Sequence, residues 1–293
     1  MRLHHHQFRH RPLGTAVVIA LLTLVGACTG GSAGDEEPPS VQELADGELA
    51  GGQAVDRIEV SESPTEGTVD VAVVMDAGAT AAQAGEVADD ARAFAERHRK
   101  RAASRWTSQL YVGEPGSSSV QVEIYPTVDE SAGQDVADAF ALASLPGVTS
   151  ASFAGGTPYI EVGEVADVVA LVPRLRASPA WDEGGNVHAG DDRLRIMDEP
   201  RRVTTAQLEA IARASDRYPD GSFAVEAAAS GERYPEVFVN HVTSEQATEI
   251  TRTFTDTSLA SDNTEGYELD FTMRAESASD PAATVDSAGT FGR

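Results

Sequence analysis

The predicted fold is decided by residues 68–100, which read TVDVAVVMDAGATAAQAGEVADDARAFAERHRK. Apolar residues alternate along the first eight positions, at Val69, Val71, Val73 and Met75. This is the period of a strand with one buried face. Thr80 then stands where an N-terminal helix cap is expected, and small or apolar residues recur at helical spacing through Phe94. The stretch therefore predicts a strand followed by an amphipathic helix that ends near Lys100.

The pattern continues through the first half of the chain. Strands are predicted at 108–113 and 119–126, then a helix at 131–144 and a strand at 148–153. This βαββαβ order predicts a ferredoxin-like α+β module, an antiparallel sheet with helices on one face. A short strand at 159–162 and a helix from Val165, which Pro173 kinks or ends, extend the module over residues 57–177.

The order of elements then repeats. Residues 178–190 are predicted to be a linker, with Trp181 as a staple between the two halves. Strands at 193–197, 222–227, 236–240 and 267–273 alternate with helices that start near Thr204 and Ser244. We therefore expect two tandem ferredoxin-like modules, the second over residues 191–276, followed by a disordered tail over 277–293.

A weak internal repeat accompanies these helices. Four strands are each followed by a Thr or Ser and by a glutamine at a helix start, at Gln83, Gln134, Gln207 and Gln246. The glutamines either contact a ligand or accept hydrogen bonds from free backbone N–H groups of the first turn. The second interpretation is favoured because glutamine commonly has this role at helix starts.

Composition restricts the classes of partner. The chain has 22 Lys+Arg against 47 Asp+Glu, for a net charge of −25. Such a chain repels nucleic acid, whose binding depends on neutralised phosphates. Lys100 is the only lysine, and with the abundant Ala, Gly and Val this resembles the coding bias of a GC-rich, actinobacterial genome.

The first 27 residues are predicted to be a secretory signal peptide. Arg2, Arg9 and Arg11 precede an apolar run over 16–25, which is too short to span a bilayer. The run closes on Val25-Gly26-Ala27-Cys28, and Cys28 is the only cysteine of the chain. This tetrapeptide resembles the lipobox of bacterial lipoproteins. The resemblance implies that Cys28 becomes the first mature residue and carries acyl chains, which would hold the protein at the extracytoplasmic face of the cell membrane. Residues 28–56, rich in Gly, Ser, Pro and acids, are predicted to be a disordered acidic tether.

The sequence contains no catalytic or metal-binding pattern with the spacing or the context that its chemistry needs. Gly30-Gly31-Ser32-Ala33-Gly34 matches GxSxG, but it lies in the predicted tether rather than between a strand and a helix. His98, His188 and His241 have no metal-ligand spacing. The acidic loop 262–268 lacks the length of an EF-hand loop, and we interpret it as a solvated turn. No catalytic, cofactor-binding or metal-binding residue is therefore predicted, and no cofactor.

Two further features allow alternative interpretations. The basic run 97–101, with Arg105, either completes a helix C-terminus, which the helix dipole favours, or docks on anionic lipid or on the acidic second module. Trp106 and Trp181 either pack in the core or form exposed ligand platforms; packing is favoured.

The sequence favours a non-enzymatic binding or assembly module of the cell envelope, anchored through Cys28. Its expected partners are the membrane and another envelope protein. The main alternative is an envelope hydrolase with dispersed acidic residues. A solute-binding lipoprotein is disfavoured because two doubly wound lobes are not predicted.

Overall fold

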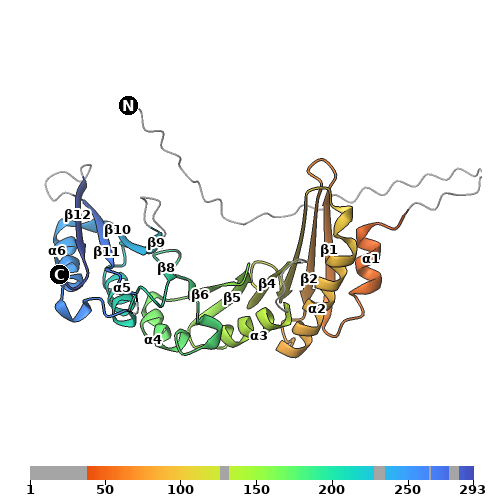
Figure 1. Ribbon diagram of the computed structural model, residues 1–293, viewed down its shortest axis with the longest axis horizontal. Coiled ribbons are helices and arrows are strands. Elements are labelled where there is room, and N and C mark those ends of the chain that lie inside the picture. Colours follow the sequence, from red (N-terminus) through yellow and green to blue (C-terminus); the bar gives the residue numbers. More distant parts are fainter. Residues whose placement is uncertain (1–37, 126–131, 228–234, 264, 277–283) are drawn as a thin grey trace, which may run out of the picture. The chain divides into compact units, whose positions relative to one another are not determined.

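Twelve strands follow one another through one hydrogen-bonded sheet in the order of the sequence (Figure 1). The computed structural model describes residues 38–125, 132–227, 235–263, 265–276 and 284–293. The described residues from Val41 to Arg293 belong to one compact unit. The strands are β1 (Val55–Ser63), β2 (Thr68–Met75), β3 (Arg105–Val112), β4 (Val120–Ile124), β5 (Val148–Ala154), β6 (Thr157–Val162), β7 (Gly185–Ala189), β8 (Leu194–Asp198), β9 (Ser222–Ala227), β10 (Pro235–Thr243), β11 (Asp270–Glu276) and β12 (Thr284–Thr290).

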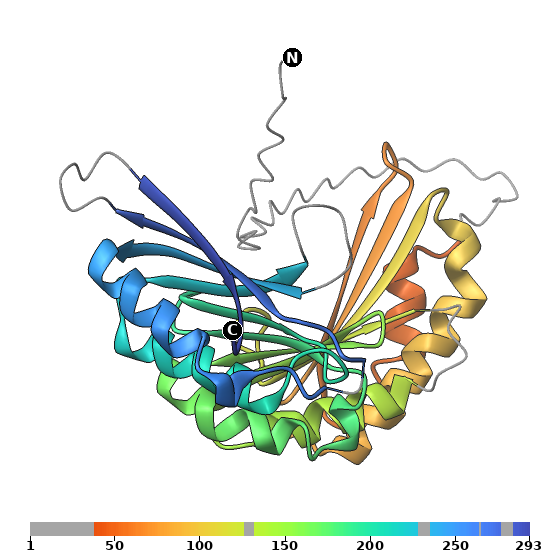
Figure 2. The same cartoon turned by 60° about the vertical axis from the view of Figure 1, so that its left-hand side comes forward.

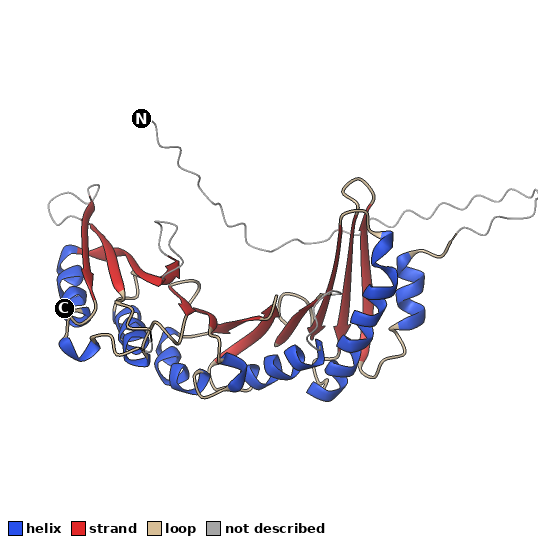
Figure 3. Cartoon of the chain, in the orientation of Figure 1, coloured by secondary structure: helices blue, strands red, loops and turns tan. Residues whose placement is uncertain are grey.

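Helices α2 to α6 lie on one face of this sheet, and the described part of the chain places no helix on the other face (Figures 2 and 3). We call the uncovered side the helix-free face. The helices are α1 (Val41–Glu48), α2 (Ala81–His98), α3 (Ala132–Ala143), α4 (Val165–Leu175), α5 (Thr205–Arg217) and α6 (Ser244–Phe254). Three 3₁₀ turns join them to their neighbours, η1 (Arg99–Arg101), η2 (Pro179–Trp181) and η3 (Thr257–Leu259). No described helix is both long enough and apolar enough to cross a membrane.

The prediction of two antiparallel ferredoxin-like modules is wrong. Strand pairing alternates along the sheet: β1 and β2 are antiparallel, β2 and β3 are parallel, and this alternation continues to β12. Each of the helices α2 to α6 joins two strands that are direct neighbours and run parallel. In a ferredoxin-like split βαβ unit another strand lies between the two. The predicted helices and strands follow one another as expected, but α1, β1, β7 and β12 were not predicted, and the predicted neighbours in the sheet were wrong.

The predicted linker is part of the sheet. Residues 178–190 contain η2 and β7, and β7 pairs in parallel with β6 and antiparallel with β8. Trp181 is fully buried and its Nε1 donates to Asp198 Oδ2 at 2.9 Å. One continuous apolar core runs beneath all the helices, so the boundary between two modules does not exist.

Two predicted disordered segments contain regular structure. Within residues 28–56, α1 packs through Val41 and Ala45, and β1 starts at Val55. Within residues 277–293, β12 pairs with β11, and the stretch ends on buried Phe291. Residues 1–37 and 277–283, which include the predicted signal peptide and Cys28, lie outside the described residues.

Predictions that depend on the residues of a single helix are mostly confirmed. Thr80 caps α2, and the predicted helix stripe is buried at Ala84, Val87, Ala88, Ala91, Phe94 and Ala95. Pro173 lies inside α4, two residues before its end. The cap of α6 is Thr243 rather than Ser244.

Candidate functional site

The helix-free face carries a row of uncharged side chains. Residues in direct register across six neighbouring strands, β3 to β8, form the row Tyr111, Gln121, Ser152, Tyr159, Asn186 and Met197. We call this set the uncharged row. Neighbouring strands lie about 4.8 Å apart, so the row is about 24 Å long.

The alternation of each strand places these side chains on the helix-free face. In β3, for example, Leu110 and Val112 are buried beneath the helices, and Tyr111 between them faces the opposite way. Tyr159 is 41% exposed although it is large and aromatic. Exposed tyrosine among Ser, Gln and Asn is typical of surfaces that bind proteins, because tyrosine offers apolar area and a hydrogen-bonding group at small entropic cost.

The rows beside the uncharged row are charged. One carries Glu123 in register with Gln109. The other carries Glu161 and His188, followed by Arg195. The chain has a net charge of −25, so charged side chains are expected on its surface. An uncharged strip of this length is therefore the feature of the helix-free face that differs from this expectation.

A hollow of about 480 Å³ lies on the helix-free face beside the row. Its lining includes Asp70, Arg105, Thr107, Gln109, Glu123 and Tyr125. Tyr125 is 36% exposed, and its hydrogen bond to the Glu123 carboxylate, with partial burial, raises the pKa of Tyr125 to about 12. The Tyr111 hydroxyl donates to Gln109 Oε1, which connects the hollow to the uncharged row.

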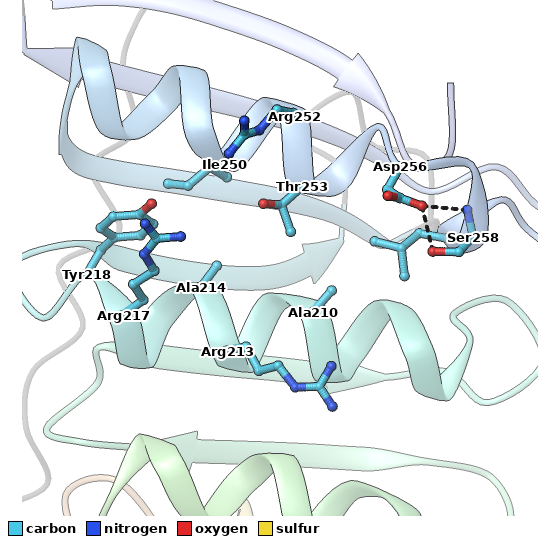
Figure 4. A pocket seen from close by; sticks show the side chains of 11 residues that line it. Ala210, Arg213, Ala214, Arg217, Tyr218, Ile250, Arg252, Thr253, Asp256 and Ser258 are labelled. Atoms are coloured by element: carbon cyan, nitrogen blue, oxygen red, sulfur yellow. Dashed lines mark hydrogen bonds between the residues drawn. The ribbon is translucent and has the colours of Figure 1, made fainter.

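A second pocket, also of about 480 Å³, lies between α5 and α6 on the helical side. Figure 4 shows Ala210 and Ala214 facing α6, while Arg213 points away from it. The short alanine side chains leave the space between the helices open. Two of the three arginines that line this pocket have carboxylate partners: Arg213 bonds Glu209 at 2.7 Å, and Arg217 bonds Glu249 at 2.8 Å. The third is Arg252.

Three of the four repeated glutamines have the structural role that was favoured. In α2, α5 and α6 the N-cap threonine side chain accepts from the backbone N–H of the glutamine, whose side chain accepts from the cap backbone. The glutamines in these capping boxes are Gln83, Gln207 and Gln246. Gln134 instead donates to Asp138 at 2.9 Å.

The histidines lie far apart in the fold. His98 bonds Glu48 at 2.9 Å and packs on Phe94, and His188 bonds Asp192 at 3.1 Å. His241 is exposed at the end of β10, with φ of 58°. The described residues contain no group of three His, Cys, Asp or Glu side chains arranged to hold a metal ion.

The acidic loop 262–268 is held by side chains of its own. Asn263 Nδ2 donates to the carbonyls of Arg202 and Tyr267, and Glu265 bonds Arg202 at 2.8 Å. These contacts occupy groups that a calcium ion would need.

The basic run begins with two residues that contact α1. Arg97 and His98 at the end of α2 both bond Glu48 of α1, at 2.5 and 2.9 Å. Trp106 and Trp181 are both buried, so the packing interpretation is right for each. Ser32 of the GxSxG match lies outside the described residues.

Comparison with protein-family models, with curated proteins and with solved structures finds no match to this chain.

Proposed function

We propose that this protein is a non-enzymatic binding module of the cell envelope, and that its helix-free face receives another envelope protein. The observation that carries the proposal is the uncharged row from Tyr111 to Met197. It crosses six strands with no helix above it in the described part of the chain. Because the row is rich in Tyr, Gln, Ser and Asn, it matches the composition of adaptable protein-binding surfaces.

The anchor remains part of the proposal. The lipobox-like tetrapeptide that ends at Cys28 would attach the chain to the extracytoplasmic face of the membrane through acyl chains. The body beyond it carries most of the acidic excess, which anionic headgroups repel. The helix-free face would thereby remain available to a protein partner rather than to the bilayer.

The hydrolase alternative receives less support. A general acid needs a carboxyl group whose pKa is raised toward neutrality. The described carboxyl groups with clearly displaced pKa values are all shifted downward, mainly by hydrogen bonds from Arg97, Arg57, Tyr218 and Ser258 to, respectively, Glu48, Glu114, Glu249 and Asp256. A solute-binding lipoprotein is disfavoured as well, because one continuous sheet does not form two lobes around a ligand.

A photo-crosslinking experiment in the anchored full chain tests the binding face. A benzophenone side chain at Tyr159 should give one defined adduct in native envelopes. The same side chain at Arg213, which is 62% exposed on the helical side, serves as the control and should not. The captured protein, once purified, should bind the unmodified chain at least tenfold more tightly than a Tyr111→Ala, Tyr159→Ala variant. Equal affinity for both chains would refute the role of the row.

The anchor is tested separately. Cys28→Ser should release the protein from the membrane fraction into the medium, since one residue carries the acyl chains. Retention of the variant in the membrane would contradict lipidation and leave the binding face untouched.

A further inference from the structure

The two edge strands of the sheet, β1 and β12, differ in whether other residues cover their outward backbone groups. At the β1 edge, the side-chain amide of Gln42 in α1 donates to the carbonyl of Ile58 at 3.3 Å and accepts from the N–H of Val60 at 3.0 Å. The amide thus takes the place that the peptide group of a neighbouring strand would occupy. An additional strand cannot pair at this point of β1 while α1 is in place.

The β12 edge has no such cover from the described residues. Phe291 N–H donates to Leu269 O at 2.9 Å, and the same register places Ser287 opposite Met273. Because hydrogen-bonded and non-hydrogen-bonded pairs alternate along antiparallel strands, Val285, Ser287 and Gly289 bond β11. Asp286 and Ala288, between them, direct their backbone groups outward, where the described residues supply no partner.

This edge is rigid rather than frayed. Phe291, which directly follows β12, stacks on Phe254 with ring centroids 4.4 Å apart and meets Phe271 edge-on at 5.7 Å. Gly292 N–H donates to Phe254 O at 2.9 Å. β12 therefore presents a strand that is already ordered, which reduces the entropic cost of pairing.

The edge also lacks the usual protection against pairing. Exposed edge strands are commonly blocked by Lys, Pro or a bulge. β12 reads TVDSAGT and continues its register without a bulge. Its single charge, Asp286, is neutralised by Arg274 at 3.3 Å. The strand is thus nearly neutral in a chain of net charge −25.

We propose that β12 pairs antiparallel with β12 of a second copy of this chain, with the two-fold axis at Ser287. In this register Asp286 lies opposite Ala288 of the second copy, so the acids do not face each other. Val285, which is 52% exposed, lies opposite a glycine. The outward N–H and C=O groups of the two strands then lie opposite each other and form about eight hydrogen bonds.

The two-fold axis stands perpendicular to the sheet, so both helix-free faces point to the same side. The contact doubles the area of the proposed binding face, but it does not depend on that proposal. A seven-residue edge is about 24 Å long at 3.4 Å per residue. Since such a contact is below the size of a standard interface, we expect a weak dimer with a dissociation constant on the order of micromolar. The acidic bodies repel, so added salt should strengthen the dimer.

Disulfide trapping tests the register. In the full chain with Cys28→Ser, Ser287→Cys should form a disulfide-linked dimer on mild oxidation. The two residues would form a non-hydrogen-bonded pair with Cα atoms about 4.5 Å apart, within disulfide reach. Ala288→Cys is the matched control. Residue 288 lies opposite residue 286 of the second copy, so the two introduced cysteines are two positions apart in the register and should not form a disulfide. Equal trapping of both variants, or of neither at high protein concentration, would overturn the proposal.

Substitutions at Ala288 test the edge by sedimentation velocity. Ala288→Pro removes an outward N–H that β11 does not use, so the fold is retained and dimerisation should weaken at least tenfold. Ala288→Glu would face Asp286 of the second copy and should weaken the dimer, whereas Ala288→Lys should not. A chain that is monomeric at all concentrations and salts would refute self-pairing and assign the edge to a strand of another protein.

Discussion

Arg176 bonds Asp198 through two guanidinium nitrogens, with Nη2 2.5 Å from Oδ1 and Nε 3.2 Å from Oδ2. The side chain of Asp198 is 3% exposed and that of Arg176 is 13% exposed. Arg176 also donates to Val203 O at 2.7 Å, and Trp181 Nε1 donates to Asp198 Oδ2 at 2.9 Å. This buried network joins the end of α4, η2, β8 and the approach to α5, on both sides of the segment 178–190 that was predicted to be a linker.

Removal of one member of this network should be costly. In Asp198→Ala the buried guanidinium loses its charge partner, and we expect the free energy of unfolding to fall by about 3–5 kcal/mol. Urea unfolding followed by circular dichroism measures the loss. Asp192→Asn is the control: the His188–Asp192 pair is exposed, asparagine tolerates the φ of 66° at this position, and the free energy of unfolding should change by less than about 1 kcal/mol. A loss for Asp198→Ala no larger than the control would show that the network does not hold this part of the sheet.

Two glycines with similar backbone angles should respond differently to alanine. Gly184 has φ of 86°, and a Cβ there would lie 2.0 Å from Asp198 O. Gly116 has φ of 88° with open space around it. Gly116→Ala should therefore cost only the left-handed strain of about 1–2 kcal/mol. Gly184→Ala adds a clash with backbone, and thermal unfolding should show a clearly larger loss. Similar losses would mean that the turn at Gly184 can relax away from β8.

The contact between α1 and α2 should weaken in acid. The hydrogen bond from Arg97 holds the pKa of Glu48 below its ordinary value, and a hydrogen bond from His98 lowers it further. A depressed carboxyl pKa stabilises the fold above the unfolded pKa, and this contribution is lost as pH falls through the folded pKa. Hydrogen exchange at the β1 edge, at Val60, should therefore accelerate below about pH 4 after correction for intrinsic rates.

Glu48→Gln should show the faster exchange already at neutral pH and little further change in acid. Glu66→Gln, in the exposed loop between β1 and β2, is the matched control and should behave as the unmodified chain. If acid accelerates exchange equally in the unmodified chain and in Glu48→Gln, Glu48 does not control the contact.

The hollow on the helix-free face should contain a tyrosine with an unusual titration. The hydrogen bond to Glu123 raises the pKa of Tyr125 to about 12 from an ordinary value of 10. Because the folded pKa is raised, the stabilisation is present below pH 10 and is lost as pH rises toward 12. Glu123→Gln should return the pKa of Tyr125 toward 10, as measured by NMR titration of labelled tyrosine. A Tyr125 titration that this substitution leaves unchanged would refute the contact.

Local sequence signals predicted most elements because each depends on a few neighbouring residues. Thr80 with Gln83 fixes the start of α2, and the alternation from Val69 to Met75 fixes the buried side of β2. The choice of neighbouring strand depends instead on contacts distant in sequence. The first residue of β7, Gly185, has no room for a side chain, because a Cβ there would lie 2.7 Å from Pro158 and 2.8 Å from Trp181. The sequence alone placed the same glycine in the predicted linker 178–190.

The uncharged row was missed for a related reason. Tyr111 and Tyr159 occupy the exposed phase of their strands, and only the register between strands brings them into one line. The signal in the sequence was an aromatic residue at a position where the alternation requires a polar one. α1 was missed because only Val41, Ala45 and the adjoining Leu49 are buried in an otherwise acidic stretch.

The alternation of parallel and antiparallel pairs gives the sheet a repeating unit of two strands and one helix. Each unit pairs with one neighbouring unit through its first strand and with the other neighbouring unit through its second strand. Duplication of the coding segment for one unit would lengthen the sheet by about 10 Å and leave every flanking register intact. The extent of the helix-free face can therefore change in evolution by whole units, without the invention of a new fold.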